Sequence, residues 1–132
     1  MTIGQRIKKI RLFRGMTQKE LGNTLGFGVH GDIRIAQYES GVRTPKEQML
    51  KKRADVLCVQ PAVFSSRVCI SKNDFMQSLF WMEESKGGGD IYDCIREWEN
   101  MKSRYEDGEI SEEEYFQWKL TYNSNPPTGT TV

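Results

Sequence analysis

One short stretch of the sequence brings together four polar side chains of the kinds that contact DNA. Arg34 and Gln37 are three positions apart, so they share one side of a helix. Through paired hydrogen bonds in the major groove, Gln recognises adenine and Arg recognises guanine. Arg43 and Lys46 follow in a basic segment past Gly41, well placed for phosphates of the DNA backbone. The stretch therefore predicts a base-reading helix followed by a phosphate-binding loop.

Helix starts and stops are clearly marked along the chain. A capping box, in which a hydroxyl residue is followed three positions later by an acid, begins at Thr17, Thr44 and Ser111, and in a weaker form at Ser71. Pro45 is expected at the first helical position after Thr44, where its missing N–H costs nothing. Glycines are expected to end three helices, at positions 15, 26 and 41.

Apolar residues recur every three or four positions between these signals, as they do on one face of a helix. In residues 1–65 this spacing predicts five short helices, the last at 61–64, and the core residues Ile3, Ile7, Ile10, Phe13, Leu21, Leu25, Ile35, Tyr38, Met49, Leu50, Ala54 and Leu57. No stretch alternates between apolar and polar residues over a strand's length. The sequence therefore predicts an all-α fold.

The chain is expected to contain four parts. Residues 1–65 form a compact helical domain, and residues 66–89 provide a connecting helix at 74–84 and a glycine-rich linker. Residues 90–122 form a hairpin of two helices with an aromatic seam, and residues 123–132 form a disordered tail.

Charge divides the chain into two unlike halves. Residues 1–65 carry twelve Lys/Arg and five Asp/Glu, a net charge of +7, whereas residues 66–132 carry seven and thirteen, a net charge of −6. This asymmetry indicates that the first half binds a polyanion and the second half does not. The apolar runs are too short to span a membrane. The three cysteines lack metal-type spacing, so we interpret them as reduced thiols of a cytoplasmic protein.

Residues 3–64 resemble the lambda-repressor/Cro-like helix-turn-helix domains of the XRE family. Several motifs carry the resemblance together: RIKKIR at 6–11, GMTQKEL at 15–21, LG at 25–26, IAQYESG at 35–41 and TP at 44–45. The resemblance implies a five-helix domain that binds double-stranded DNA, usually as a dimer, in a prokaryotic regulator of transcription.

The DNA-contacting residues are assigned on this basis. Base reading is expected from Ile33, Arg34 and Gln37, and phosphate contact from Thr17, Gln18, His30, Arg43, Thr44 and Lys46. For several of these residues an ordinary solvent-exposed role is the alternative. Glu39 is expected to hold the domain together through Arg6 or Arg11.

The segment 27–33 is longer than the turn usual in the family. We expect Asp32 to cap a helix that starts at Ile33, with Gly28 and Gly31 supplying positive φ angles. His30 reaches a phosphate in one interpretation; in the other, the extra residues only lengthen the turn.

The C-terminal hairpin resembles the short C-terminal SHOCT type, through the Gly-Glu-Ile-Ser and Glu-Glu-Tyr-Phe-Gln-Trp-Lys pattern after Tyr105. Such hairpins are associated with oligomerisation, which would use Trp98, Met101, Tyr105, Tyr115 and Trp118. In the alternative interpretation, these side chains pack only against one another or onto the first domain.

These features favour a cytoplasmic, DNA-binding repressor of transcription that acts as a homodimer on an inverted-repeat operator. The alternative is an antitoxin-like interaction protein that binds a partner through residues 71–122 and regulates its own gene. An enzyme is not expected, because the acids at 112–114 suit a helix N-terminus and no nucleophile–base pair accompanies them. The sequence predicts no cofactor and no metal, since His30 is the only histidine.

Overall fold

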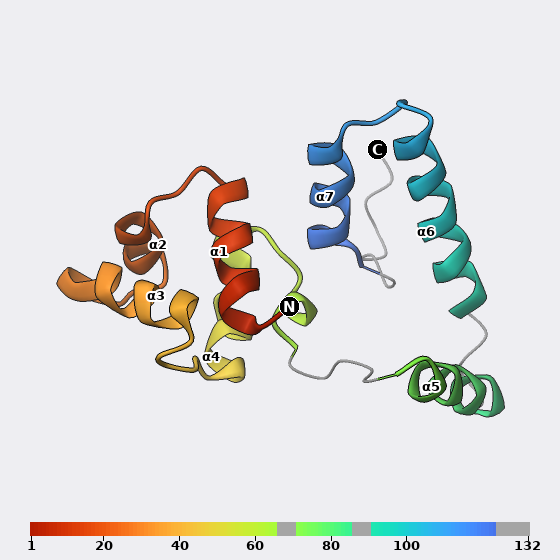
Figure 1. Cartoon of the computed structure of the whole chain (residues 1–132), viewed down its shortest axis with the longest axis horizontal. Helices are drawn as coiled ribbons and strands as arrows, with labels where there is room; N and C mark the ends of the chain where they lie inside the picture. Colours follow the sequence, from red (N-terminus) through yellow and green to blue (C-terminus); the bar gives the residue numbers. More distant parts are fainter. Residues whose placement is uncertain (66–70, 86–90, 124–132) are drawn as a thin grey trace, which may run out of the picture. The chain divides into compact units, whose positions relative to one another are not determined.

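The structure, a computed structural model, describes residues 1–65, 71–85 and 91–123 (Figure 1). The chain divides into two compact units, Met1–Ser66 and Arg67–Val132. Every regular element of the described ranges is helical, which confirms the all-α prediction. Within these ranges, no helix combines the length and the hydropathy needed to cross a membrane. The expected glycine linker at 87–89 and most of the expected disordered tail lie outside the described residues.

The first unit contains four α-helices and three short 3-10 helices. The α-helices are α1 (Ile3–Phe13), α2 (Gln18–Thr24), α3 (Gly31–Ser40) and α4 (Glu47–Lys52). The 3-10 helices are Gly28–His30, directly before α3, then Asp55–Leu57 and Pro61–Phe64. The core consists of Ile7, Ile10, Leu21, Leu25, Ile35, Tyr38, Leu50, Ala54, Leu57, Val59 and Phe64. Most of the predicted core is therefore confirmed, whereas Ile3, Phe13 and Met49 are only half-buried.

Local capping fixes where several helices begin. Thr17 and Ser111 accept hydrogen bonds from the backbone N–H groups of Glu20 and Glu114, as their capping boxes predict. Ser71 caps α5 (Lys72–Glu84) through the N–H of Asp74. A further capping box at Thr2 and Gln5, which the sequence reasoning missed, begins α1.

The capping box expected at Thr44 is wrong. Helix α4 begins only at Glu47, and its N-cap residue Lys46 has an extended backbone and makes no side-chain cap. Pro45 is buried and lies two positions before the helix, not at its first turn. Pro45 is thus part of the buried interior of the unit and not of the first turn of α4.

The start of α3 also differs from the expectation. The helix begins at Gly31, and Asp32 is its second residue and not its cap. Gly28 has the predicted positive φ, of 76°, but Gly31 has a helical φ of −61°. Gly31 lies against Gly22 of α2: a Cβ on Gly31 would be 2.9 Å from the Cα of Gly22. Glycine is needed here because two helix backbones approach closely, not because of a left-handed conformation.

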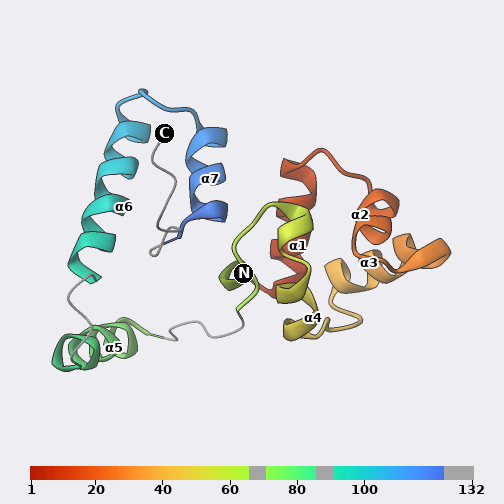
Figure 2. The same ribbon diagram turned by 180° about the vertical axis from the view of Figure 1, so that it is seen from behind.

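The second unit contains α5, α6 (Ile91–Glu106) and α7 (Glu112–Thr121). Helices α6 and α7 lie side by side, joined by a turn in which Gly108 has a φ of 78° (Figures 1 and 2). Tyr92 of α6 donates a 2.5 Å hydrogen bond to the carboxylate of Glu83 on α5, which raises the pKa of the tyrosine. Helix α5 leaves several large apolar side chains exposed: Phe75, Met76, Phe80, Trp81 and Met82.

Candidate nucleic-acid interface

Helix α3 has a buried face and an opposite exposed face. Gly31, Ile35 and Tyr38 form the buried face, against α1 and α2. With 3.6 residues per turn, the opposite side holds residues at spacings of three, four and seven positions. These residues are Ile33, Ala36, Gln37 and Ser40, and we call them the α3 outer face. Of the predicted base-reading residues, Ile33 is 54% exposed and Gln37 is half-buried.

Arg34 lies at the edge of the α3 outer face, next to the 3-10 helix. Its guanidinium carbon is 4.8 Å from the centre of the Phe27 ring, a cation–π contact. Phe27 in turn makes an edge contact with Tyr38, with ring centres 6.0 Å apart. Phe27 therefore links the Arg34 side chain to the core residue Tyr38. Arg34 lies on the same side of α3 as Gln37.

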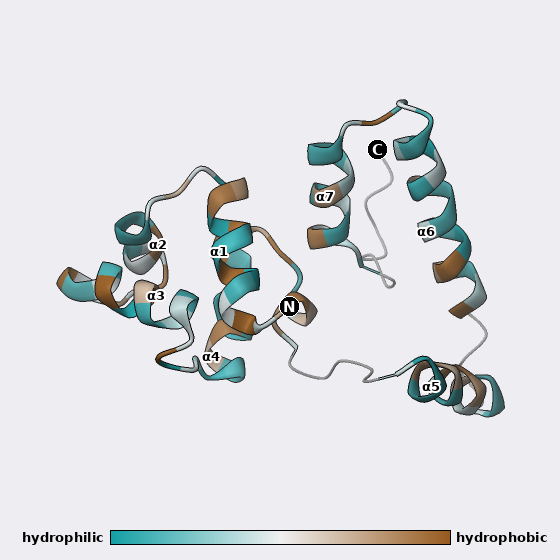
Figure 3. Ribbon diagram, viewed as in Figure 1, coloured by the Kyte–Doolittle hydropathy of each residue, from teal (hydrophilic) through white to brown (hydrophobic). Residues whose placement is uncertain are grey.

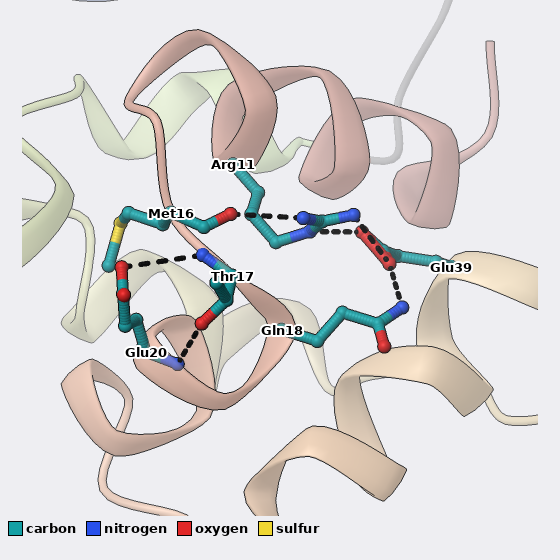
Figure 4. Close-up of polar contacts among 6 residues, drawn as sticks. All are labelled: Arg11, Met16, Thr17, Gln18, Glu20 and Glu39. Atoms are coloured by element: carbon teal, nitrogen blue, oxygen red, sulfur yellow. Dashed lines mark hydrogen bonds and ion pairs between the residues drawn. The ribbon is translucent and has the colours of Figure 1, made fainter.

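A buried carboxylate ties three helices together (Figure 4). Arg11 of α1 donates through Nε to Oε1 of Glu39 at 2.7 Å, and Gln18 of α2 donates through Nε2 to Oε2 of Glu39 at 2.8 Å. The Arg11 and Glu39 side chains are only 11% and 6% exposed. This confirms the expected role of Glu39 and selects Arg11 as its partner. Arg6 instead donates to the carbonyl oxygens of residues 63 and 65.

Thr17 and Gln18, predicted to contact phosphate, both take part in the domain's own hydrogen bonds. The Thr17 hydroxyl accepts from the N–H of Glu20 at 3.0 Å, and the Gln18 amide is held by Glu39. The bond between Gln18 and Glu39 holds the start of α2 beside α3 and orients the Gln18 side chain. Phosphate contact by these two residues stays a prediction.

The other predicted phosphate contacts lie at both ends of α3. His30 is exposed and precedes the first residue of the helix. After Gly41, whose φ is 82°, Arg43, Thr44 and Lys46 are all exposed. The N–H of Arg43 donates to the carbonyl of Gln37 at 3.1 Å, so the loop folds back against the end of α3. The structure thus places exposed basic residues directly after the C-terminal end of α3.

The electrostatics of this unit favour an anionic partner. Its exposed Lys and Arg residues include Lys8, Lys9, Lys19, Arg43, Lys46, Lys52 and Arg53. The acid of α3 closest to its C-terminus, Glu39, is paired with Arg11 and so adds no free negative charge to the surface. The first unit as a whole therefore carries a net positive charge, +7 over residues 1–65.

Three residues of this region were not predicted from the sequence: Val29 and Ser40, which are exposed, and Ala36, which is half-buried. Because the extra loop residues hid the start of α3, the outer face could not be placed by counting from the helix end. Counting from the core residues Ile35 and Tyr38 would have placed Ala36 and Ser40 on it.

The predicted oligomerisation residues lie on the α6–α7 hairpin with different exposures. Tyr115 is buried: it accepts a 2.8 Å hydrogen bond from the Trp98 indole and stacks on Tyr105, with ring centres 5.1 Å apart. Trp98 and Tyr105 remain 50% and 37% exposed, and the two other residues, Met101 and Trp118, are half-buried. The aromatic seam thus partly packs within the hairpin and partly faces outward.

Among the described residues, no group of three His, Cys, Asp or Glu side chains is arranged to hold a metal ion. Two cysteines of the described ranges, Cys58 and Cys94, are free thiols.

A family model described as a helix-turn-helix domain matches residues 4–57, which include α1 to α4. No curated protein and no solved structure matches the chain. The hairpin's resemblance to the SHOCT type stays a prediction. The matched residues contain both the α3 outer face and the basic loop after it, the two features that helix-turn-helix domains use on DNA. Residues 4–57 therefore form a helix-turn-helix domain, which supports the XRE-like resemblance and indicates a DNA-binding regulator of transcription.

Proposed function

We propose that this protein represses transcription by binding a specific double-stranded DNA operator as a homodimer. The observation that carries the proposal is the α3 outer face, which points away from the core on the third helix of a helix-turn-helix domain and is followed along the chain by the exposed Arg43 and Lys46. In such domains the corresponding helix enters the major groove, where base edges differ between all four base pairs.

Each part of the surface has a role in this proposal. Gln37 pairs with an adenine, and Arg34 with a guanine at the border of the face. Arg43, Thr44 and Lys46 bind phosphates and set the position of α3 along the groove. Gln18, held by Glu39, offers its remaining amide hydrogen to a phosphate near the start of α2. Repression then requires only that the bound protein occupy a promoter.

The proposal of a homodimer rests on the length of DNA that one helix-turn-helix domain covers. A single helix-turn-helix domain covers a half-site, and dimers place two reading helices about 34 Å apart, one turn of DNA. The unit carrying this domain is strongly positive, which opposes its own self-association. The exposed Trp98 and Tyr105 of the hairpin support assembly through residues 90–122, because aromatic side chains are enriched at interface cores.

Selection of duplex DNA from a random pool by the purified full-length protein tests the proposal. We expect an enriched inverted repeat, and a footprint of the same sequence upstream of the protein's own gene. Competition with a scrambled duplex of equal length provides the control for charge-driven binding, since both duplexes carry the same phosphates. Equal affinity for the two duplexes would contradict sequence-specific regulation.

One observation favours a second candidate, the antitoxin-like interaction protein. Helix α5 lies in the acidic half and exposes Phe75, Phe80 and Trp81, a surface suited to a protein partner. Coexpression with the protein encoded by the neighbouring gene distinguishes the two: neutralised toxicity and a stable complex would favour the antitoxin.

A further inference from the structure

Apolar residues lie on the outward side of α3 near its N-terminal end and in the 3-10 helix directly before it. Val29, in the 3-10 helix directly before α3, is 85% exposed, and Ile33, four positions later, is 54% exposed. Ala36 follows on the same side of the helix, half-buried. In Figure 3, hydrophobic residues colour part of the ribbon at this end of α3.

Val29 and Ile33 are exposed, so packing in the core does not explain their chemical type. The core of the unit is built from the opposite side of α3, by Ile35 and Tyr38, which are 0% and 6% exposed. A single exposed apolar residue is ordinary in a folded protein. Here, however, apolar residues lie next to Gln37 on the surface that the proposed function assigns to the bases.

The chemistry of the major groove gives this combination a meaning. Thymine alone carries an apolar group on its major-groove edge, the methyl at C5, and small apolar side chains recognise it by contact. Glutamine, in turn, makes its two-bond pair with adenine. Apolar side chains and an amide therefore read the two partners of the same base pair. Arg34, the residue suited to guanine, lies at the border against Phe27.

We infer that the N-terminal part of this surface reads consecutive A·T pairs, with Val29, Ile33 and Ala36 contacting thymine methyl groups and Gln37 contacting an adenine. This inference rests on the proposed function and makes it more specific: it names the base pairs of the half-site and assigns Val29 a role in reading them. The extended loop is then a means of bringing a further apolar side chain to the bases.

Replacement of thymine by uracil in the selected operator isolates the methyl group, because uracil keeps every hydrogen bond of the A·T pair. Removing one buried methyl should weaken binding of the full-length protein about 4-fold. When several methyl groups are removed, their separate fold-changes in affinity should multiply. The uracil duplex is compared with the thymine duplex at one salt concentration, so the phosphate contribution is unchanged.

Alanine variants assign the effect to side chains. I33A and V29A should each bind the thymine duplex more weakly and lose most of the preference at one thymine position. The matched control is V56A, which shortens another exposed valine, 52% exposed in the 3-10 helix Asp55–Leu57, and should keep the full preference. Because all three side chains are exposed, the variants should fold, which circular dichroism verifies.

The outcomes separate this inference from the proposed function. Specific binding with equal affinity for thymine and uracil duplexes would overturn the inference and leave the proposed function standing. A methyl preference that persists in both I33A and V29A would also overturn it, since other residues would then read the methyl. A protein that binds selected and scrambled duplexes equally would overturn the proposed function itself.

Discussion

At the scale of single residues, Glu39 shows how a buried charge positions a binding surface. Its two carboxylate oxygens are shared between Arg11 and Gln18, so α1, α2 and α3 meet at one side chain. Arg11 also donates to the carbonyl of Met16 at 3.0 Å, just before α2. A charge removed from water in this way is stable only while its partners remain.

Replacement of Glu39 by alanine should therefore destabilise the first unit strongly. The guanidinium of Arg11 would stay buried without its counter-charge, which typically costs about 3–5 kcal/mol, and its bond to Met16 favours the lower end. Urea unfolding followed by circular dichroism measures the loss. The control is Lys51→Gln, which breaks the more exposed Lys51–Glu47 pair and should cost at most about 1 kcal/mol. Equal losses in the two variants would contradict a structural role for the buried pair.

Base reading by Gln37 and Arg34 makes a separate prediction. Each alanine variant should lose about 1–3 kcal/mol of binding free energy on the selected operator and discriminate less at one base position. Titration with operator duplexes changed at one position at a time identifies that position. If both variants keep full discrimination between operator and scrambled duplex, our placement of these residues on the bases is wrong.

The basic loop after α3 should act on affinity and not on specificity. Arg43→Ala and Lys46→Ala should weaken binding about equally on all sequences, and each should reduce the slope of log K against log salt by about one unit. Lys72→Ala, which removes an exposed charge from the second unit, is the matched control and should leave the slope unchanged. A slope that stays constant in the loop variants would show that they do not meet phosphate.

At the scale of elements, the contact between α2 and α3 depends on two glycines. A Cβ on Gly22 would lie 2.6 Å from the carbonyl carbon of Gly31, closer than packed atoms come. Gly31→Ala should therefore push the helices apart, lower the free energy of unfolding by about 1–3 kcal/mol and weaken operator binding.

Gly28→Asn is the control for that variant, on the turn just before α3. A Cβ there would meet nothing within 4 Å, and Asn tolerates the left-handed conformation that Gly28 adopts. The control should thus cost less than about 1 kcal/mol. Thermal unfolding of both variants checks the comparison, and an Ala variant as stable as the Asn variant would contradict the close packing.

Sequence patterns whose residues interact within one helical turn predicted helix starts correctly. Patterns whose outcome depends on packing between distant residues did not. The capping boxes at Thr17 and Ser111 formed because both partners lie in the same turn. Thr44 has the same pattern, but Pro45 is buried and α4 begins only at Glu47, after an extended Lys46. Gly31 could be recognised as special from the sequence, yet its reason, the backbone of Gly22, lies on another helix.

The candidate site follows the same division. The placement of Ile35 and Tyr38 in the core, and hence the side of α3 that faces outward, could be predicted from apolar spacing. The exposed position of Val29 directly before α3 could not, because the length of the turn decides which residue precedes the helix. The bond from Gln18 to Glu39 joins residues far apart in the sequence, so no local pattern indicates it.

At the scale of the whole molecule, the positive charge and the large exposed aromatic side chains of the described residues fall on different units. The first unit has the positive surface, whereas the second has the acidic residues together with the exposed aromatic side chains of α5 and α6. This separation suits a chain that binds DNA with one unit and another protein chain with the other.

The homodimer proposed above can be tested in the full-length chain. Trp98→Ala and Tyr105→Ala should shift the sedimentation profile from dimer toward monomer and weaken operator binding, because each removes an exposed aromatic side chain of the hairpin. Trp81→Ala, which removes a 69% exposed tryptophan from α5, is the control and should remain dimeric. Dissociation caused only by the Trp81 variant would move the interface from the hairpin to α5, and a monomeric parent protein would exclude the dimer.

The two faces of α3 also have a consequence for how such a protein changes over generations. The residues that hold the helix in place, Gly31, Ile35, Tyr38 and Glu39, are different from those that point outward, Ile33, Ala36, Gln37 and Ser40. Substitutions in the second set leave the core and the buried ion pair untouched. If the outward set reads DNA as proposed, a lineage can thus change the DNA sequence it recognises without first becoming less stable, and a designer can graft a new outward sequence onto the same scaffold.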